Sequence, residues 1–200
     1  MILLCCAVDA ELAFWRPRDG VELLVTGVGP VEAASAVAAA LASKPYRLVV
    51  NAGIAGAFDG AAAVGDGVVV SDECMELRLE SGESFSLPRG ERTVEQVRSD
   101  ERLVERMRAA GYSSLRGVTV SRVTSSEATA RRLVETLEAQ VESMEGFAAL
   151  RAAQRAGVPA IEVRGISNRC GAREASGWNF TAGIAGLQNV TGALFEICTP

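Results

Sequence analysis

The 200-residue sequence contains no histidine. This absence excludes a Ser-His-Asp triad, a Cys-His nucleophilic pair, a histidine-ligated zinc ion and an imidazole acid or base. Lysine is nearly absent as well, because Lys44 is the only one and stands in a polar Ser-Lys-Pro turn, so a lysine Schiff base is not expected. Any chemistry must therefore use carboxylates, amides, hydroxyls, arginines or thiols.

Basic residues are in deficit: 20 Lys and Arg stand against 25 Asp and Glu, which gives a net charge of −5. A face that binds nucleic acid phosphates normally needs a basic surplus, so no nucleic acid partner is expected. The apolar run at residues 1–8 lacks a basic flank and is cut short by Asp9 and Glu11. It predicts neither a signal peptide nor a membrane span, and no membrane partner is expected.

The five cysteines include no CxxC pair, and their spacing fits no zinc site. Their odd number, with Cys5 and Cys6 in an apolar run, indicates reduced thiols and a cytoplasmic location. We expect no metal and no cofactor.

The length and the 48% apolar content predict one domain over residues 1–200 with a sizeable core. Apolar runs predict strands at residues 2–8, 21–26, 46–50, 64–71, 115–120 and 160–166, with a short strand near 141 and residues 74–79 pairing with 64–71. Periodicity and capping residues predict helices at 30–43, 95–110, from 125 or 126 to 137, from 144–146 to 156, and 178–197. This alternation indicates an α/β fold, a single three-layer domain whose mixed, mostly parallel sheet has helices on both faces.

Polar or glycine-rich clusters follow four of the strands, at Asp9/Glu11, residues 51–56, residues 143–145 and Ser167/Asn168. Ligands of α/β proteins bind beyond the carboxyl ends of strands, so these clusters predict one site. The Gly27-Val-Gly29 turn lacks the third glycine of a dinucleotide fingerprint. It is either a plain strand-to-helix turn or a turn whose N–H groups approach a ligand.

Two charged residues have alternative interpretations. Glu145, between Met144 and Phe147, is either a site carboxylate or a residue that complements a helix dipole. Arg164 lies in an apolar strand, where burial would require a carboxylate partner such as Glu11 or Glu145; alternatively, it faces water from an edge strand.

Six motifs together resemble the nucleoside phosphorylase/nucleosidase family of purine N-ribosyl enzymes, and they span nearly the whole chain. They are Ala-Val-Asp-Ala-Glu11, Thr-Gly-Val-Gly29, Asn-Ala-Gly-Ile-Ala-Gly56, Val64-Gly-Asp66 with Val-Val-Val-Ser-Asp72, Ser-Met-Glu145-Gly and Val-Arg164-Gly-Ile-Ser-Asn168. Within the family, residues 162–168 followed by Arg173-Glu174 and Trp178-Asn-Phe180 are most similar to the futalosine hydrolase branch. The resemblance implies hydrolysis of the N-ribosidic bond of futalosine, with release of hypoxanthine, in menaquinone biosynthesis.

The resemblance also implies roles for individual residues. Glu11 would polarise the attacking water, Arg164 would help to hold it, and Met144 and Glu145 would clamp the ribose. The predicted wall of the pocket further includes Gly29, Ala52, Gly53, Val123, Thr124 and Ser143, together with Ile54, which stands where hydrolytic relatives often carry serine. Family relatives are usually dimers or larger, so a homodimer or a higher homo-oligomer is expected.

Asn168 occupies the position that faces the purine edge, where adenine-cleaving relatives carry aspartate. Asparagine has no titratable proton, but its NH₂ can donate to N7 or O6 of a base. A fixed donor favours a 6-oxopurine over adenine, because a mismatched pair leaves buried donors unpaired. Arg169 or Arg173 could meet the aromatic carboxylate of futalosine, and Trp178 or Phe180 could stack on its ring.

Four alternatives remain open at this point. A phosphorylase of the same family would need arginines near the two glycine loops, which contain none, although Arg89 and Arg122 lie elsewhere in the chain. A methylthioadenosine/S-adenosylhomocysteine nucleosidase would share the fold. A non-catalytic nucleoside-binding module would bind without releasing base, and a nicotinamide-dependent enzyme is poorly supported by the glycine turn.

Overall fold

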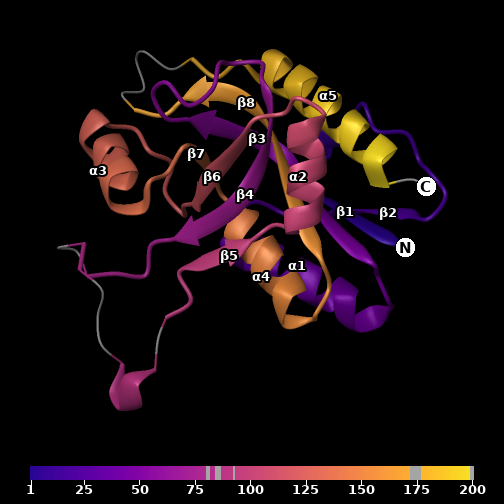
Figure 1. Ribbon diagram of the computed structural model, residues 1–200, viewed down its shortest axis with the longest axis horizontal. Coiled ribbons are helices and arrows are strands. Elements are labelled where there is room, and N and C mark those ends of the chain that lie inside the picture. Colours follow the sequence, from indigo (N-terminus) through magenta and orange to yellow (C-terminus); the bar gives the residue numbers. More distant parts are fainter. Residues whose placement is uncertain (80–81, 84–86, 92, 172–176, 199–200) are drawn as a thin grey trace.

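Apolar strands alternate with helices and build an eight-stranded mixed sheet with helices on both faces (Figure 1). The computed structural model describes residues 1–79, 82–83, 87–91, 93–171 and 177–198. The strands are β1 (Ile2–Cys6), β2 (Val21–Val25), β3 (Leu48–Ala57), β4 (Gly67–Met75), β5 (Gln96–Arg98), β6 (Ser114–Thr119), β7 (Val141–Ser143) and β8 (Ala160–Arg169). The helices are α1 (Pro30–Ser43), α2 (Glu101–Ala109), α3 (Glu127–Leu137), α4 (Gly146–Arg155) and α5 (Phe180–Cys198), with short 3-10 turns η1 (Asp9–Leu12) and η2 (Pro88–Gly90).

Most strand pairs are parallel, as the sequence predicted. β1 pairs in parallel with β2 and β3, β3 with β8, β4 with β6, and β6 with β7. The pairs β3–β7, β4–β5 and β4–β8 are antiparallel. The pairings β3–β8–β4–β6–β7 return to β3, so these five strands form a closed circuit that draws several strand ends together.

Two apolar layers hold the helices on the sheet. On one face, α2 and α5 pack against β1, β3 and β8 through residues such as Leu4, Met107 and Leu187. On the other face, α1 and α4 pack through residues such as Val37 and Leu150. The predicted three-layer α/β class is therefore confirmed.

Three local predictions are wrong. The strand expected at residues 46–50 does not end before residue 51, because β3 continues to Ala57 and stays paired with β8 from Val49 onward. Residues 67–75 form the single strand β4, so the 64–71 and 74–79 segments are not two paired strands. The helix expected from residue 95 begins only at Glu101, because Asp100 caps it by accepting a hydrogen bond from the Leu103 N–H at 3.1 Å.

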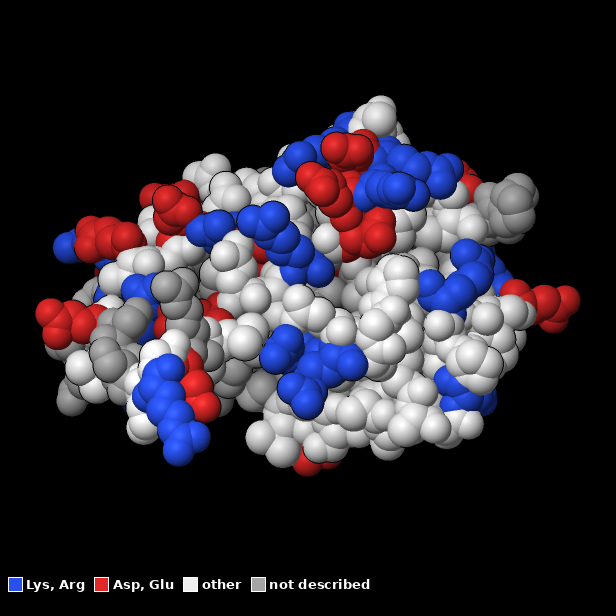
Figure 2. All heavy atoms as spheres, turned by 60° about the horizontal axis from the view of Figure 1, so that its bottom comes forward, with Lys and Arg blue, Asp and Glu red and all other residues white. Residues whose placement is uncertain are grey.

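Charged side chains of both signs are interspersed over the face that Figure 2 shows. Within the described part of the chain, no helix is long and apolar enough to cross a bilayer.

Cys5, Cys6, Cys74 and Cys170 are buried, and all five cysteines are free thiols.

Candidate active site

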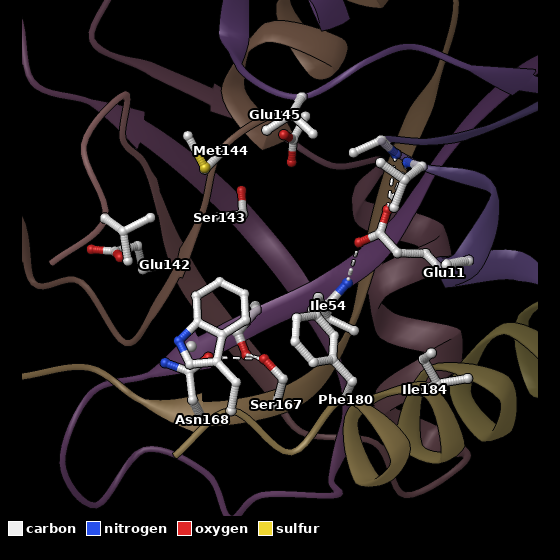
Figure 3. Close-up of a pocket in the computed structure, with 18 residues that line it drawn as sticks. Glu11, Ile54, Glu142, Ser143, Met144, Glu145, Ser167, Asn168, Phe180 and Ile184 are labelled. Carbon is white, nitrogen blue, oxygen red and sulfur yellow. Dashed lines mark hydrogen bonds between the residues drawn. The ribbon is translucent and has the colours of Figure 1, made fainter. Parts of the chain in front are cut away.

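The ends of β3, β7 and β8, the turn after β1 and the start of α5 surround a cavity of about 220 Å³ (Figure 3). The cavity brings together residues that lie more than 150 positions apart in the sequence. Of the residues predicted to form the site, those that line it are Glu11, Ile54, Val123, Ser143, Met144, Glu145, Asn168 and Trp178. Figure 3 shows Glu11 and Glu145 toward one side of the cavity and Glu142 and Asn168 toward the other.

Three backbone N–H groups hold the carboxylate of Glu11, which is only 7% exposed. Its Oε2 accepts hydrogen bonds from Ala7 N at 2.9 Å and Val8 N at 3.3 Å, and its Oε1 accepts one from Ile54 N at 2.9 Å. The turn η1 that follows β1 therefore ties Glu11 to the end of β3. Both oxygens act as acceptors, and the side chain has a fixed direction (Figure 3).

Glu145 lies at the start of α4 and is 6% exposed. Its Oε1 accepts a hydrogen bond from Gly29 N at 2.8 Å, across a sequence separation of 116 residues. Gly29 has a φ of +100°, a conformation that favours glycine, and it precedes Pro30 at the start of α1. The Gly27-Val-Gly29 turn thus orients a cavity carboxylate, and Gly29 itself is not part of the cavity wall.

Gly53 allows Glu11 and Arg164 to approach the same point of β3. A Cβ at this position would lie 2.3 Å from Arg164 Nη1 and 2.7 Å from Glu11 Oε1. No side chain larger than hydrogen fits there without displacing one of these groups. Ala52 is completely buried next to it and, like Gly53, does not line the cavity.

Arg164 is 1% exposed in the central strand β8, so the edge-strand interpretation is wrong. The ion-pair partner suggested by the sequence is also wrong, because Nε donates to Glu162 Oε1 at 2.7 Å, two residues away on the same face of the strand. Burial would lower the pKa of Arg164, but the negative charges of Glu162, Glu145 and Glu11 raise it. Arg164 therefore stays charged below the cavity wall, close to Glu11 and Glu145 without pairing with either.

At the other side of the cavity, the amide of Asn168 is oriented by its neighbours. Its Oδ1 accepts a hydrogen bond from Ser167 Oγ at 2.8 Å, and its Nδ2 donates to the Arg169 carbonyl at 3.2 Å. One hydrogen of the NH₂ group is left for a ligand. Trp178 and Phe180 stand nearby with ring centroids 5.2 Å apart, and both line the cavity.

The remaining predicted residues lie elsewhere. Thr124 is buried behind the wall, where its N–H donates to Glu142 Oε1 at 3.0 Å and its hydroxyl donates to Glu142 Oε2. Arg169 forms an ion pair with Asp59 at 3.3 Å and is not part of the wall. Arg173 lies outside the described residues.

The structure adds a cavity carboxylate that the sequence analysis missed, Glu142. Burial raises the pKa of Glu142, whereas the two Thr124 donors lower it. Its signal in the sequence was an acidic residue inside a short predicted strand, directly before Ser143. Phe180, which the sequence offered as a stacking residue, lines the cavity as well, and so does Ile184, four residues later on the first turns of α5.

The chain belongs to the phosphorylase superfamily, whose family model matches residues 17–197. The family resemblance of the six motifs is thereby confirmed. Among curated proteins, the chain is 37% identical over 193 residues to the futalosine hydrolase of Streptomyces coelicolor, covering 91% of this chain and 81% of that protein. It is 32% identical over 182 residues to the futalosine hydrolase of Thermus thermophilus, covering 86% of this chain and 81% of that protein.

Solved structures of the same fold include a 5′-methylthioadenosine/S-adenosylhomocysteine nucleosidase from Neisseria meningitidis, in complex with methylthio-immucillin-A. It superposes with a TM-score of 0.81 over 98% of each chain, at 16% sequence identity. This likeness supports the fold and, at that identity, nothing further.

Proposed function

We propose that this chain is an N-glycosyl hydrolase that cleaves futalosine at its N-ribosidic bond and releases hypoxanthine, in menaquinone biosynthesis. The relatives named futalosine hydrolase support this substrate. We further propose that residues 1–200 act as one nucleosidase-like domain, in a homodimer or larger homo-oligomer in the cytoplasm.

The observation that carries the proposal is the charge of the cavity. Its described wall contains the carboxylates of Glu11, Glu142 and Glu145, and no Lys or Arg among the described lining residues. A phosphate nucleophile would be repelled by this wall, because anions are usually bound by arginines or backbone N–H groups. Water is neutral and needs only a base. Hydrolysis is therefore favoured over phosphorolysis.

Glu11 is the proposed general base. A carboxylate fixed by three N–H donors can take a proton from water and direct its oxygen toward C1′ of the ribose. The oxygen that accepts from Ile54 N lies on the side where Arg164 approaches Gly53, so Arg164 is the proposed partner in orienting the water.

Glu145 is the proposed acceptor for the ribose hydroxyls. Gly29 N occupies part of Oε1, which leaves Oε2 and the remaining lone pair of Oε1 for hydroxyl donors. Ser143 and Met144, from the same end of β7, would complete the sugar side of the wall. As the bond to the base breaks, positive charge develops on the sugar, and the nearby carboxylates stabilise it.

The base would lie between Asn168 and Glu142. Hypoxanthine presents O6 and N7 as acceptors and N1–H as a donor. The free N–H of Asn168 matches an acceptor, and the carboxylate of Glu142 matches N1–H. Adenine reverses both groups at its Watson–Crick edge, which leaves buried polar groups unpaired and disfavours it.

The test is release of free base from futalosine, inosine and methylthioadenosine, each with and without phosphate. We expect hypoxanthine from futalosine at a rate independent of phosphate and slow cleavage of methylthioadenosine. Phosphate-dependent turnover would identify a phosphorylase. Equal cleavage of methylthioadenosine and futalosine would contradict the proposed base recognition, and binding of inosine without release of base would indicate a non-catalytic nucleoside-binding protein.

A further inference from the structure

A second group of charged side chains lies beneath the cavity wall. Glu73 in β4 and Glu162 in β8 are 0% exposed, and Arg164 in β8 is 1% exposed. None of the three lines the cavity. Since burying an unpaired charge is costly, each of these charges needs compensation inside the protein.

One guanidinium faces two carboxyl groups here. Arg164 donates through Nε to Glu162. Glu73 is held by neutral groups instead: the Thr119 hydroxyl donates to its Oε2 at 2.8 Å, and the Ser143 hydroxyl lies 3.5 Å from its Oε1. If both carboxyl groups were ionised, one negative charge would be left in a dry volume without a counter-charge.

The two carboxyl groups converge on the same glycine, Gly146. A Cβ on Gly146 would lie 2.4 Å from Glu73 Oε1 and 2.6 Å from each oxygen of Glu162, so both side chains press on the same glycine. Two ionised carboxyl groups that converge on one point in a dry volume repel each other, and a proton held by one of them removes this repulsion and can be donated to the other. Without that proton, Glu162 Oε2 has no hydrogen-bond donor in the described chain. Burial, followed by the charge of Glu162, raises the pKa of Glu73 well above its ordinary value.

We propose that Glu73 and Glu162 share one proton beneath the cavity, and that Glu162 thereby takes up the charge of Arg164 and leaves the charges of Glu11 and Glu145 for the substrate. Glu73 is then a neutral acid that donates to Glu162, and Glu162 is the anion. Both are positioning residues, because they act on the substrate only through Arg164 and Ser143. The catalytic part of this inference depends on the proposed function, whereas the shared proton does not.

The consequence follows from the charges around Arg164. Glu162, Glu145 and Glu11 are the anions that act on it. If Glu162 were neutral, Arg164 would be balanced only by Glu145 and Glu11, and both would become weaker bases. The other titratable groups near these carboxylates are Asp9 and Cys6 beside Glu11, and Cys74 beside Glu73 on β4.

The shared proton is tested without any substrate. At neutral pH, infrared spectroscopy should detect the carbonyl stretch of a protonated carboxylic acid in the unmodified protein, and this band should be absent from Glu73→Gln. Glu105→Gln, which removes an exposed carboxylate of α2, is the matched control and should keep the band. If the band is missing from the unmodified protein, or survives in Glu73→Gln, the shared proton is refuted.

The pH dependence of stability gives a second readout. A carboxyl group with a raised folded-state pKa stabilises fully below its unfolded-state pKa, and this contribution is lost as the pH rises through the folded-state value. Glutamine does not titrate, so the Glu73→Gln variant lacks this pH-dependent contribution to stability. The unfolding free energy of Glu73→Gln minus that of the unmodified protein should therefore increase as the pH rises above the ordinary glutamate value of 4.5. A difference that does not change with pH would contradict a neutral Glu73.

The positioning role is tested by the pH profile of turnover. Glu162→Gln should lower kcat about tenfold. It should also move the acidic limb of the pH profile, which is the fall of kcat at low pH, to lower pH, because the charge of Arg164 then acts on Glu11 and Glu145 alone. Glu162→Asp keeps the charge, so it should leave the limb in place even if kcat falls. Glu73→Gln keeps a neutral donor and should also leave the limb in place.

The outcomes separate the two proposals. An unshifted limb in a folded Glu162→Gln variant would overturn the positioning role, since a purely structural residue changes stability without moving the limb. If Glu162→Gln does not fold, the positioning role is judged on the other two variants. A shift of the acidic limb in Glu162→Asp or in Glu73→Gln would then overturn it. Failure of the unmodified protein to cleave any nucleoside would refute the proposed function, and the infrared band would still decide the shared proton.

Discussion

Glu11→Gln is the most direct perturbation of the candidate site, because it removes a charge and leaves the shape. The glutamate accepts from Ala7 N, Val8 N and Ile54 N, and glutamine offers only one acceptor oxygen. Glutamine loses the fewest hydrogen bonds if its oxygen replaces Oε2, which accepts from Ala7 N and Val8 N. Its NH₂ group then faces Ile54 N, and one hydrogen bond is lost. One lost hydrogen bond to a charged group costs about 1.5–3 kcal/mol. In a domain of this size, that cost lowers Tm by about 3–12 °C.

The effect on catalysis should be larger than the effect on stability. Loss of a general base typically lowers the rate about 10²–10⁴-fold, which corresponds to about 2.7–5.4 kcal/mol of transition-state stabilisation. The assay is release of hypoxanthine at saturating futalosine, with Tm measured on the same samples. Glu105→Gln, with the same change of charge on the surface of α2, should leave both quantities unchanged. A fall in kcat of less than about tenfold in a folded Glu11→Gln protein would refute the role of Glu11 as base.

Two further substitutions test the geometry of the site. Gly53→Ala should lower kcat about 10²-fold while the circular dichroism spectrum is kept, because the new methyl group displaces Arg164 Nη1 or Glu11 Oε1; an active variant would show that neither position matters. Asn168→Asp should raise the ratio of methylthioadenosine to futalosine cleavage, because a carboxyl group can accept from the adenine amino group or, when protonated, donate to N7; an unchanged ratio would contradict base recognition by Asn168.

The elements that were predictable from the sequence have strong local signals. Pro30 after a glycine begins α1 as expected, and the helix ends at Ser43, where the alanine-rich run stops. The polar clusters at the strand ends also converge as predicted, because the carboxyl ends of parallel strands meet at one edge. The small residues at 51–56 were placed after the strand and not in it, since nothing local distinguishes the end of a strand from a strand that needs close contact with its neighbour, here β8.

The sequence analysis did not identify the ion-pair partner of Arg164. Glu162 lies two residues before Arg164, a spacing that places both side chains on one face of any strand. The sequence suggested Glu11 and Glu145 because they lay in recognisable motifs. Glu73 is 89 positions away from Glu162 in the sequence and reaches it only because β4 and β8 pair antiparallel. Glu142 was missed for a related reason, since its partner Thr124 comes from the loop after β6.

The arrangement of charge also accounts for a mechanism without histidine. An imidazole beside Glu11 and Glu145 would be held as a cation by their carboxylates, and it would cancel the negative potential that an oxocarbenium-like sugar requires. A neutral amide at the base end avoids this conflict. In the proposed mechanism, Asn168 would stabilise the departing hypoxanthine through a hydrogen bond while adding no charge to the cavity, and solvent would supply the proton afterwards. A 6-oxopurine suits such a site because it leaves more readily than adenine and places less demand on an acid. On this reasoning, the proposed preference for a 6-oxopurine and the neutral amide of Asn168 at the base end have the same physical origin.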